Sequence, residues 1–132
     1  AALLRRIQND LFDLGADLAT PGEDFTPGEM TLRIIAAQVT RLETEIDAMN
    51  IGMKPLNSFI VPGGTALGTA LHVARSVTRR AERTAITASR EVSLNPLALA
   101  YLNRLSDWLF VASRYANDHG ANDILWVPGG SR

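Results

Sequence analysis

The sequence contains no cysteine, and aromatic residues make up 6% of its 132 residues. The absence of cysteine excludes disulfide bonds and thiolate metal sites. The formal net charge is −1, whereas a general nucleic-acid binder would need a broad basic surface. No uninterrupted apolar run approaches ~18 residues, so no membrane-spanning segment is expected. The chain is long enough for one domain with a hydrophobic core, and any basic site in it must be local.

Apolar residues recur at intervals of three and four along the first half of the chain, which predicts two amphipathic helices. The first covers about residues 4–18 and ends at Thr20-Pro21-Gly22. The second is expected to open at Thr26-Pro27-Gly28-Glu29, where the order of residues is that of a capping box with proline at the first helical position. It should run to about Asn50.

The second half predicts two longer helices. One covers about residues 65–90, and the other begins at Pro96, is capped by Ser93 or Asn95, and runs to about Asn117. The core stripe of this last helix is expected to be Ala98, Leu102, Leu105, Leu109 and Ala112. No stretch alternates with period two for long enough to build a sheet. We therefore predict one all-α domain over residues 1–132, an up-and-down bundle of about four helices.

Two sets of charged residues stand out on the predicted helices. Asp10, Asp13 and Asp17 form an acidic stripe, which we interpret as a solvated face rather than a metal site. The segment "ARSVTRRAER" (residues 74–83) concentrates arginines in one run.

At about 100° per residue, three arginines and one glutamate of this run share a quarter of the helix circumference, and Arg80 points elsewhere. These four residues, called the arginine stripe below, are Arg75, Arg79, Glu82 and Arg83. A guanidinium is a rigid fork of donors that matches phosphate oxygens. Since Glu82 offsets one charge of three, the stripe favours an anionic partner.

The fourth predicted helix carries polar residues that could face the arginine stripe. Asn103 and Asp107 are four residues apart and point away from the core stripe. Asn103 could bond a ligand, and Asp107 could pair with an arginine of the third helix. From the residues alone, an anion site and a structural ion-pair network both remain open.

The remaining features have ordinary structural interpretations. Residues 63–68, "GGTALG", precede a helix but lack the P-loop lysine and the dinucleotide spacing, so we expect a turn and a cap. His72 is expected to be a packed or hydrogen-bonded side chain. Phe59, Trp108 and Trp126 are expected to anchor the core. No serine has a partnered histidine, so a hydrolase triad has little support.

Three segments carry a resemblance to a known family. "IQNDLFDLGADLATP" (7–21), "FIVPGGTALGTALHVARSVTRRAER" (59–83) and "YLNRLSDWLFVASRYAN" (101–117) resemble the PduO-type ATP:corrinoid adenosyltransferases. The resemblance covers nearly the whole chain. It implies an up-and-down bundle of five helices that assembles as a homotrimer with active sites at subunit interfaces.

The resemblance also implies an activity. Family members transfer the 5′-deoxyadenosyl group of ATP to cob(I)alamin, giving adenosylcobalamin and triphosphate, with Mg²⁺ accompanying ATP. The reduced cobalt of the corrinoid is itself the nucleophile, so the protein would contribute positioning of the substrates and electrostatic stabilisation. A non-catalytic carrier or sensor that binds a corrinoid or a nucleotide is the alternative.

Site residues follow from the resemblance position by position. The family's ATP-contacting helix segment corresponds to Arg79, Arg80, Glu82 and Arg83, and its ATP contact on the next helix corresponds to Asn103. Arg79 and Arg83 would be the catalytic residues. Arg75 resembles an arginine that pairs with an acid of a neighbouring subunit, Asp107 the acid that orders the arginine cluster, and Phe59 the aromatic that packs against the corrin. No side-chain metal ligand is assigned.

One departure from the family is large. The family's N-terminal segment carries a Thr- and Gly-rich loop with a lysine that wraps the ATP phosphates, followed by a first helix, and neither is present here. The sequence also lacks an initiator methionine, so we expect residues to be missing from its N-terminus. The protein would be cytoplasmic in a bacterium, and the missing N-terminus leaves room for an organellar targeting peptide.

Overall fold

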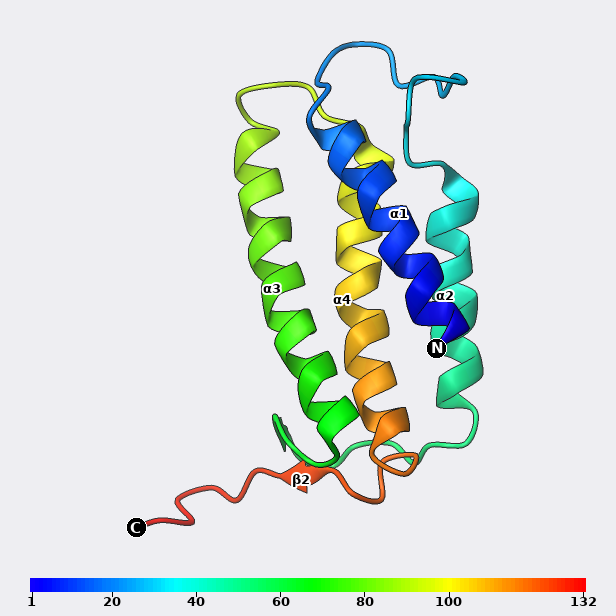
Figure 1. Cartoon of the computed structure of the whole chain (residues 1–132). Coiled ribbons are helices and arrows are strands. Elements are labelled where there is room, and N and C mark those ends of the chain that lie inside the picture. Colours follow the sequence, from blue (N-terminus) through cyan, green and yellow to red (C-terminus); the bar gives the residue numbers. More distant parts are fainter.

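Four helices form a bundle in the computed structural model, which describes all residues from 1 to 132 (Figure 1). They are α1 (Ala2–Leu18), α2 (Ala36–Asn50), α3 (Ala66–Ala88) and α4 (Pro96–Ala116). Successive helices run in opposite directions along the bundle. α4 packs against each of the other three helices and is therefore the central element. The predicted all-α, up-and-down bundle is confirmed.

α4 forms where the sequence predicts it. The side-chain oxygen of Asn95 accepts a hydrogen bond from the backbone N–H of Leu97 at 3.1 Å, and Pro96 occupies the first helical position. The five residues of the predicted core stripe are all buried. Because these side chains are apolar, their burial holds α4 between its neighbours.

α3 also begins as predicted, at a cap made by Thr65. Its hydroxyl oxygen accepts a hydrogen bond from the backbone N–H of Gly68 at 3.0 Å, so the glycine-rich segment is a turn and a cap. α3 packs against α4, and several apolar side chains on the rest of its surface remain exposed. They are Leu67, Val73, Val77 and Ile86.

The predicted start of α2 is wrong. Residues 26–35 are not helical, and α2 begins at Ala36, where the backbone N–H of Ile35 bonds the side-chain oxygen of Gln38 at 2.9 Å. The cause is a long-range contact. Arg33 and the backbone N–H of Ile34 both bond the carboxylate of Asp17 at 2.7 Å. This tie holds the segment extended across the end of the bundle, which overrides the local capping pattern.

The prediction of a solvated acidic face is also wrong. Asp17 is 1% exposed, and its carboxylate accepts a third hydrogen bond, from Asn95 Nδ2 at 2.7 Å. Asp10 is 6% exposed and accepts from Gln38 Nε2 and Tyr101 Oη, both at 3.0 Å. Burial and the Asp10 carboxylate raise the pKa of Tyr101, so the phenol stays a donor. Buried carboxylates are tolerated because their oxygens are paired.

A small sheet, which the sequence did not predict, closes one end of the bundle. β1 (Ile60–Val61) pairs antiparallel with β2 (Ile124–Leu125), with Ile60 opposite Leu125. The backbone N–H of Trp126 extends the pairing by bonding Phe59 O at 2.8 Å. The C-terminal tail leaves the bundle from this end (Figure 1). No helix of the structure combines the length and the apolar character that crossing a bilayer requires.

Candidate functional site

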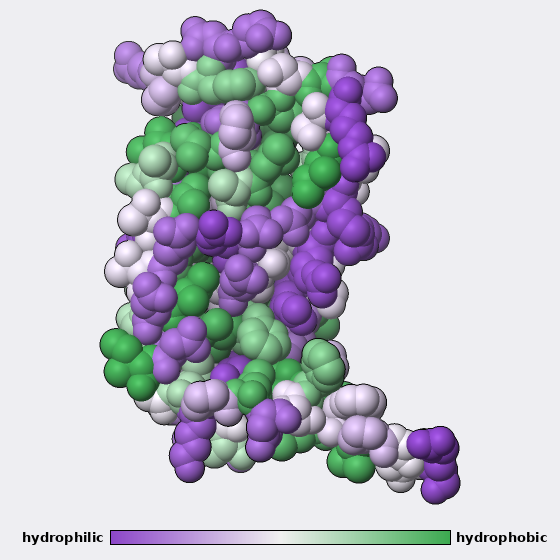
Figure 2. Space-filling model, turned by 180° about the vertical axis from the view of Figure 1, so that it is seen from behind, coloured by the Kyte–Doolittle hydropathy of each residue, from purple (hydrophilic) through white to green (hydrophobic).

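The arginine stripe lies along one side of α3. Arg79 and Arg83 are exposed, while Arg75 and Glu82 are half-buried. None of the four takes part in an ion pair within the chain. Hydrophilic side chains cover the edge of the molecule that α3 forms, on the right of Figure 2. The guanidinium groups of Arg79 and Arg83 are therefore available to an anion or to an acid from another chain.

Arg75 sits at the inner end of this stripe, against an aromatic ring. Its guanidinium carbon lies 4.9 Å from the centre of the Phe110 ring, within the range of a cation–π contact. Burial lowers the pKa of the Arg75 guanidinium, and the positive charge of Arg79 lowers it further, while Asp107 acts in the opposite direction. An anion bound here would relieve this repulsion.

The polar residues of α4 lie near the stripe without closing it. Asp107 and Asn103 are both exposed. Asp107 forms no ion pair within the chain. The side-chain oxygen of Asn103 accepts a hydrogen bond from Arg104, which in turn is paired with Glu43 at 2.7 Å. The ion pair between Asp107 and an arginine of α3 is thus absent from the isolated chain.

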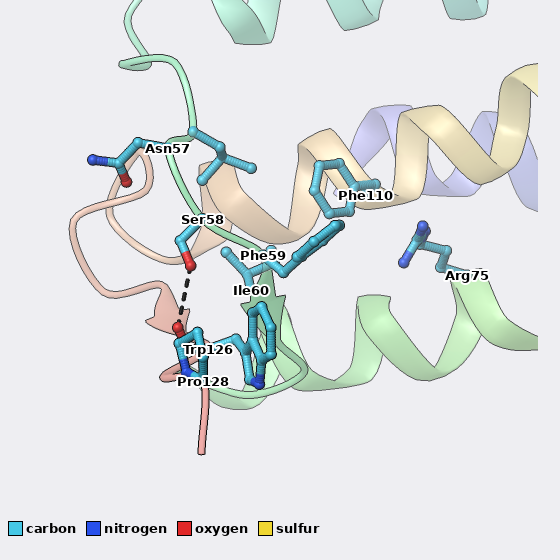
Figure 3. Close-up of a pocket in the computed structure, with 9 residues that line it drawn as sticks. Asn57, Ser58, Phe59, Ile60, Arg75, Phe110, Trp126 and Pro128 are labelled. Carbon is cyan, nitrogen blue, oxygen red and sulfur yellow. Dashed lines mark hydrogen bonds between the residues drawn. The ribbon is translucent and has the colours of Figure 1, made fainter. Parts of the chain in front are cut away.

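A cleft of about 750 Å³ opens beside Arg75, between α3, α4 and the two short strands (Figure 3). Its aromatic side chains are Phe59, Phe110 and Trp126. The rings of Phe59 and Trp126 meet edge to face, with their centres 5.9 Å apart. The structure thus brings Phe59 of the connector and Arg75 of α3 to one apolar cleft with a cationic end.

The prediction that all three aromatic residues anchor the core is right for one of them. Trp108 is 2% exposed, and its indole N–H bonds Glu45 at 2.9 Å. Phe59 is 76% exposed and Trp126 is 48% exposed. Both lie next to the two-stranded sheet, Phe59 directly before β1 and Trp126 directly after β2. Exposed aromatic rings that line a cleft indicate a binding surface rather than a core.

Arg80 lies apart from the stripe, as its helical position predicts. It lines a second groove of about 400 Å³, together with Leu18, Val77 and Leu94. A ligand contact of Arg80 would therefore be made from a different side of α3 than the contacts of Arg79.

His72 is buried on the inner side of α3, and its Nε2 atom has no hydrogen-bond partner. Burial lowers the pKa of His72, the charge of Arg75 lowers it further, and Asp123 acts in the opposite direction. The imidazole is therefore kept neutral in the folded chain at a pH where an unfolded chain would begin to protonate it. The prediction of a packed histidine is confirmed, although its ring nitrogen lacks a bond.

This burial predicts a pH dependence of stability. In the unfolded chain His72 binds a proton below about pH 6.5, whereas the folded chain resists binding it. The free energy of unfolding should therefore fall as the pH drops below that value, by at most about 1.4 kcal/mol per pH unit from this group. Denaturant unfolding at pH 7.5 and pH 5.0 measures it, and His72→Gln should reduce the difference. An unchanged difference would show that His72 is not responsible.

The sequence did not single out Asn117, which the structure places at the C-terminal end of α4 with 1% of its surface exposed. Its side chain contacts the turn that precedes α3 and the tail that precedes β2. The glycines of that turn were the one available signal, because they leave room for a close neighbour.

Comparisons with known proteins agree on one family. The cobalamin adenosyltransferase family model matches residues 1–116. The corrinoid adenosyltransferase of Mycobacterium tuberculosis is 52% identical over 132 residues, which cover 98% of this chain and 67% of that protein. The corrinoid adenosyltransferase PduO of Salmonella typhimurium is 37% identical over 127 residues, which cover 95% of this chain and 37% of that protein.

Solved structures give the same result. A variant PduO-type ATP:corrinoid adenosyltransferase from Lactobacillus reuteri, complexed with cobalamin and ATP, superposes with a TM-score of 0.82 at 41% identity. The match covers 95% of this chain and 68% of that one. The chain thus spans about two thirds of the length of the Mycobacterium and Lactobacillus relatives. By sequence and by fold, it belongs to the cobalamin adenosyltransferase family.

Proposed function

We propose that this chain carries the corrinoid adenosyltransferase activity of its family, which transfers the 5′-deoxyadenosyl group of ATP to cob(I)alamin. The observation that carries the proposal is the placement of an unpaired arginine stripe beside an exposed aromatic cleft. The stripe suits a polyphosphate. The cleft suits the apolar face of a corrin ring. A relative that shares this fold, the PduO-type ATP:corrinoid adenosyltransferase variant from Lactobacillus reuteri, was solved with cobalamin and ATP.

The reaction needs little covalent help from the protein. The electron pair of cob(I)alamin forms the cobalt–carbon bond to C5′ of ATP, and the C5′–oxygen bond breaks. The oxygen leaves with the electron pair of the broken C5′–oxygen bond, so the negative charge on the departing triphosphate grows. Catalysis then depends on aligning C5′ with cobalt and on placing fixed positive charge at the triphosphate.

We assign the roles accordingly. Arg79 and Arg83 are exposed and unpaired, so they would contact the triphosphate and act as the catalytic residues. Asn103 is exposed on the neighbouring helix and would bind ATP with Glu82. Arg80 would reach the nucleotide from the other side of α3.

Two further assignments concern the cleft. Phe59 would pack against the corrin, because its ring is exposed and lines the cleft. Arg75 and Asp107 would hold the arginine stripe in place, Arg75 by pairing with an acid of a neighbouring subunit. The contact of Arg75 with Phe110 would connect the arginine stripe, where the triphosphate would bind, to the cleft, where the corrin would bind.

The chain offers little to a metal ion by itself. No three histidine, cysteine, aspartate or glutamate side chains are grouped so that they could hold one. Magnesium commonly uses one or two carboxylates together with substrate phosphates, and Glu82 is a half-buried carboxylate without an ion pair on the stripe. We propose that Mg²⁺ arrives with ATP, where it would neutralise part of the triphosphate charge.

We also propose a homotrimer with active sites at subunit interfaces. Two features support it. Val73 and Val77 on α3 are exposed apolar residues, and Arg75 forms no ion pair within its own chain. The family's ATP loop and first helix would complete each site. In a bacterium, we propose that the protein works in the cytoplasm, where ATP is available.

Phe59→Ala tests the corrinoid side. Because the ring is 76% exposed, its loss should leave Tm nearly unchanged while it raises the KM for the corrinoid about tenfold, since apolar contact with the corrin is lost. Phe12→Ala is the matched control, because Phe12 is 83% exposed on α1 and outside the cleft. Equal corrinoid KM values for the two variants would remove Phe59 from the site.

An anaerobic turnover assay tests the activity itself. The protein, alone and extended to the length of its relatives, is mixed with magnesium-ATP and chemically reduced cobalamin. The assay follows formation of the cobalt–carbon bond by absorbance and measures free triphosphate. We expect both products in equal amounts. ATP binding without either product in the extended protein would instead support a carrier or sensor.

A further inference from the structure

The side chain of Asn117 joins three segments at the end of the bundle that carries the cleft. Its oxygen accepts hydrogen bonds from the backbone N–H and the hydroxyl of Thr65, both at 2.9 Å. The hydroxyl shares its single proton with Ala116 O at 3.1 Å. Its amide nitrogen donates to Gly63 O at 3.0 Å and to the Asp123 carboxylate at 3.3 Å. A side-chain amide can make four such bonds, so Asn117 is fully engaged although it is buried.

Asp123 and Arg114 extend this arrangement. The second carboxylate oxygen of Asp123 accepts from Arg114 Nε at 2.8 Å, and Arg114 Nη2 donates to Lys54 O at 3.0 Å. The side chains of Arg114 and Asp123 are 10% and 2% exposed, so solvent screens their ion pair weakly. Together the three side chains fix both ends of the connector between α2 and α3, at Lys54 and at Thr65.

Gly64 in the turn and Gly68 at the start of α3 both lie close against the side chain of Asn117. Gly64 has a φ of 101°, and a Cβ there would lie 2.5 Å from the Asn117 amide nitrogen. A Cβ on Gly68 would collide with the Asn117 oxygen. The amide is therefore packed against backbone on one side, which leaves its position little freedom.

This arrangement matters for the cleft because Phe59 cannot fix its own position. Its ring is mostly exposed, and its segment is tied to the bundle at the two ends of the connector and through the pairing of β1 with β2. β2 begins directly after Asp123. A shift of Asn117 would consequently move Phe59 and Trp126 relative to Arg75, which belongs to the helix itself.

We infer that Asn117, acting with Asp123 and Arg114, is a positioning residue that sets the aromatic wall of the corrinoid cleft. The inference rests on the proposed function. A change at Asn117 should affect the two substrates differently, because Arg79 lies eleven residues beyond Gly68, about 16 Å along α3. Loosening the turn should therefore disturb corrinoid binding and leave the triphosphate contacts in place.

The test compares Asn117→Asp with Asn122→Asp in the turnover assay. Both variants add one negative charge in the same region, but Asn122 is exposed and its side chain makes no hydrogen bond. Asn117→Asp replaces the donor to Gly63 O and Asp123 by a second acceptor. We expect it to raise the KM for the corrinoid about tenfold, with the KM for ATP changed less than about twofold. Asn122→Asp should match the wild type in both.

A milder variant guards against loss of folding. Asp123→Asn keeps the bonds between Asn117 and the turn but weakens the tie to Arg114, so the same selective rise should appear at about threefold. Equal corrinoid KM values for the wild type and both variants, or a parallel rise in the KM for both substrates, would overturn the inference. A wild-type protein that binds neither substrate would instead contradict the proposed function, and the inference with it.

Discussion

Replacement of Arg79 by alanine is expected to lower kcat/KM for ATP by about 100-fold, the scale at which one preorganised charge on a developing anion acts. Arg79 is exposed in the middle of the arginine stripe and has no acid partner in the chain. Its removal should therefore leave folding unchanged and reduce the stabilisation of the departing triphosphate. Steady-state kinetics at saturating cob(I)alamin measure the loss.

Arg90→Ala is the control for this variant. Arg90 follows the end of α3, is exposed, and makes no ion pair, so it has the same chemistry outside the stripe. We expect its kcat/KM for ATP to stay within about twofold of the wild type. A comparable small effect of both replacements would show that the triphosphate binds elsewhere.

Replacement of Asp17 by asparagine is expected to cost about 3–5 kcal/mol of the free energy of unfolding. The carboxylate is buried and accepts hydrogen bonds from Arg33, from the backbone of Ile34 and from Asn95, each at 2.7 Å. An amide would turn a donor toward one of these donors and leave the charge of Arg33 buried without its partner. Denaturant unfolding monitored by circular dichroism measures the loss.

Asp13→Asn controls for the change of charge. Asp13 belongs to the same acidic stripe of α1 but is half-buried and forms no ion pair, so its replacement should change stability by less than about 0.5 kcal/mol. The double replacement Asp17→Asn with Arg33→Met should recover part of the loss, because no charge is then left buried. Equal stability of the two single variants would contradict the account of the buried pair.

The sequence predicted the elements that local chemistry determines. Thr65 and Asn95 are capping residues next to the helices they cap, and the core stripe of α4 repeats with the helical period. The arginine stripe could be predicted for the same reason, because four positions on one helix have fixed angular relations. The closeness of the arginine stripe to Phe59 could not be predicted in this way, since it depends on how the connector between α2 and α3 folds back.

The features that the sequence did not predict depend on distant residues. Asn95 lies 78 positions from Asp17, and their hydrogen bond is part of what turns an apparently solvated aspartate into a buried one. The start of α2 is displaced by the bonds of Arg33, and the two strands are too short to show a period. Asn117 looks like an ordinary end of a helix until the turn at Gly64 is placed beside it.

The central claim is that the arginine stripe binds the triphosphate group of ATP and the free triphosphate that the reaction releases. Inhibition of turnover by free triphosphate, competitive with ATP, tests it most directly because the inhibitor contains neither adenosine nor a corrinoid. We expect Arg79→Ala to raise the inhibition constant of triphosphate about tenfold or more, and Arg90→Ala to leave it unchanged. An inhibition constant that is the same in the wild type and in Arg79→Ala would contradict the claim.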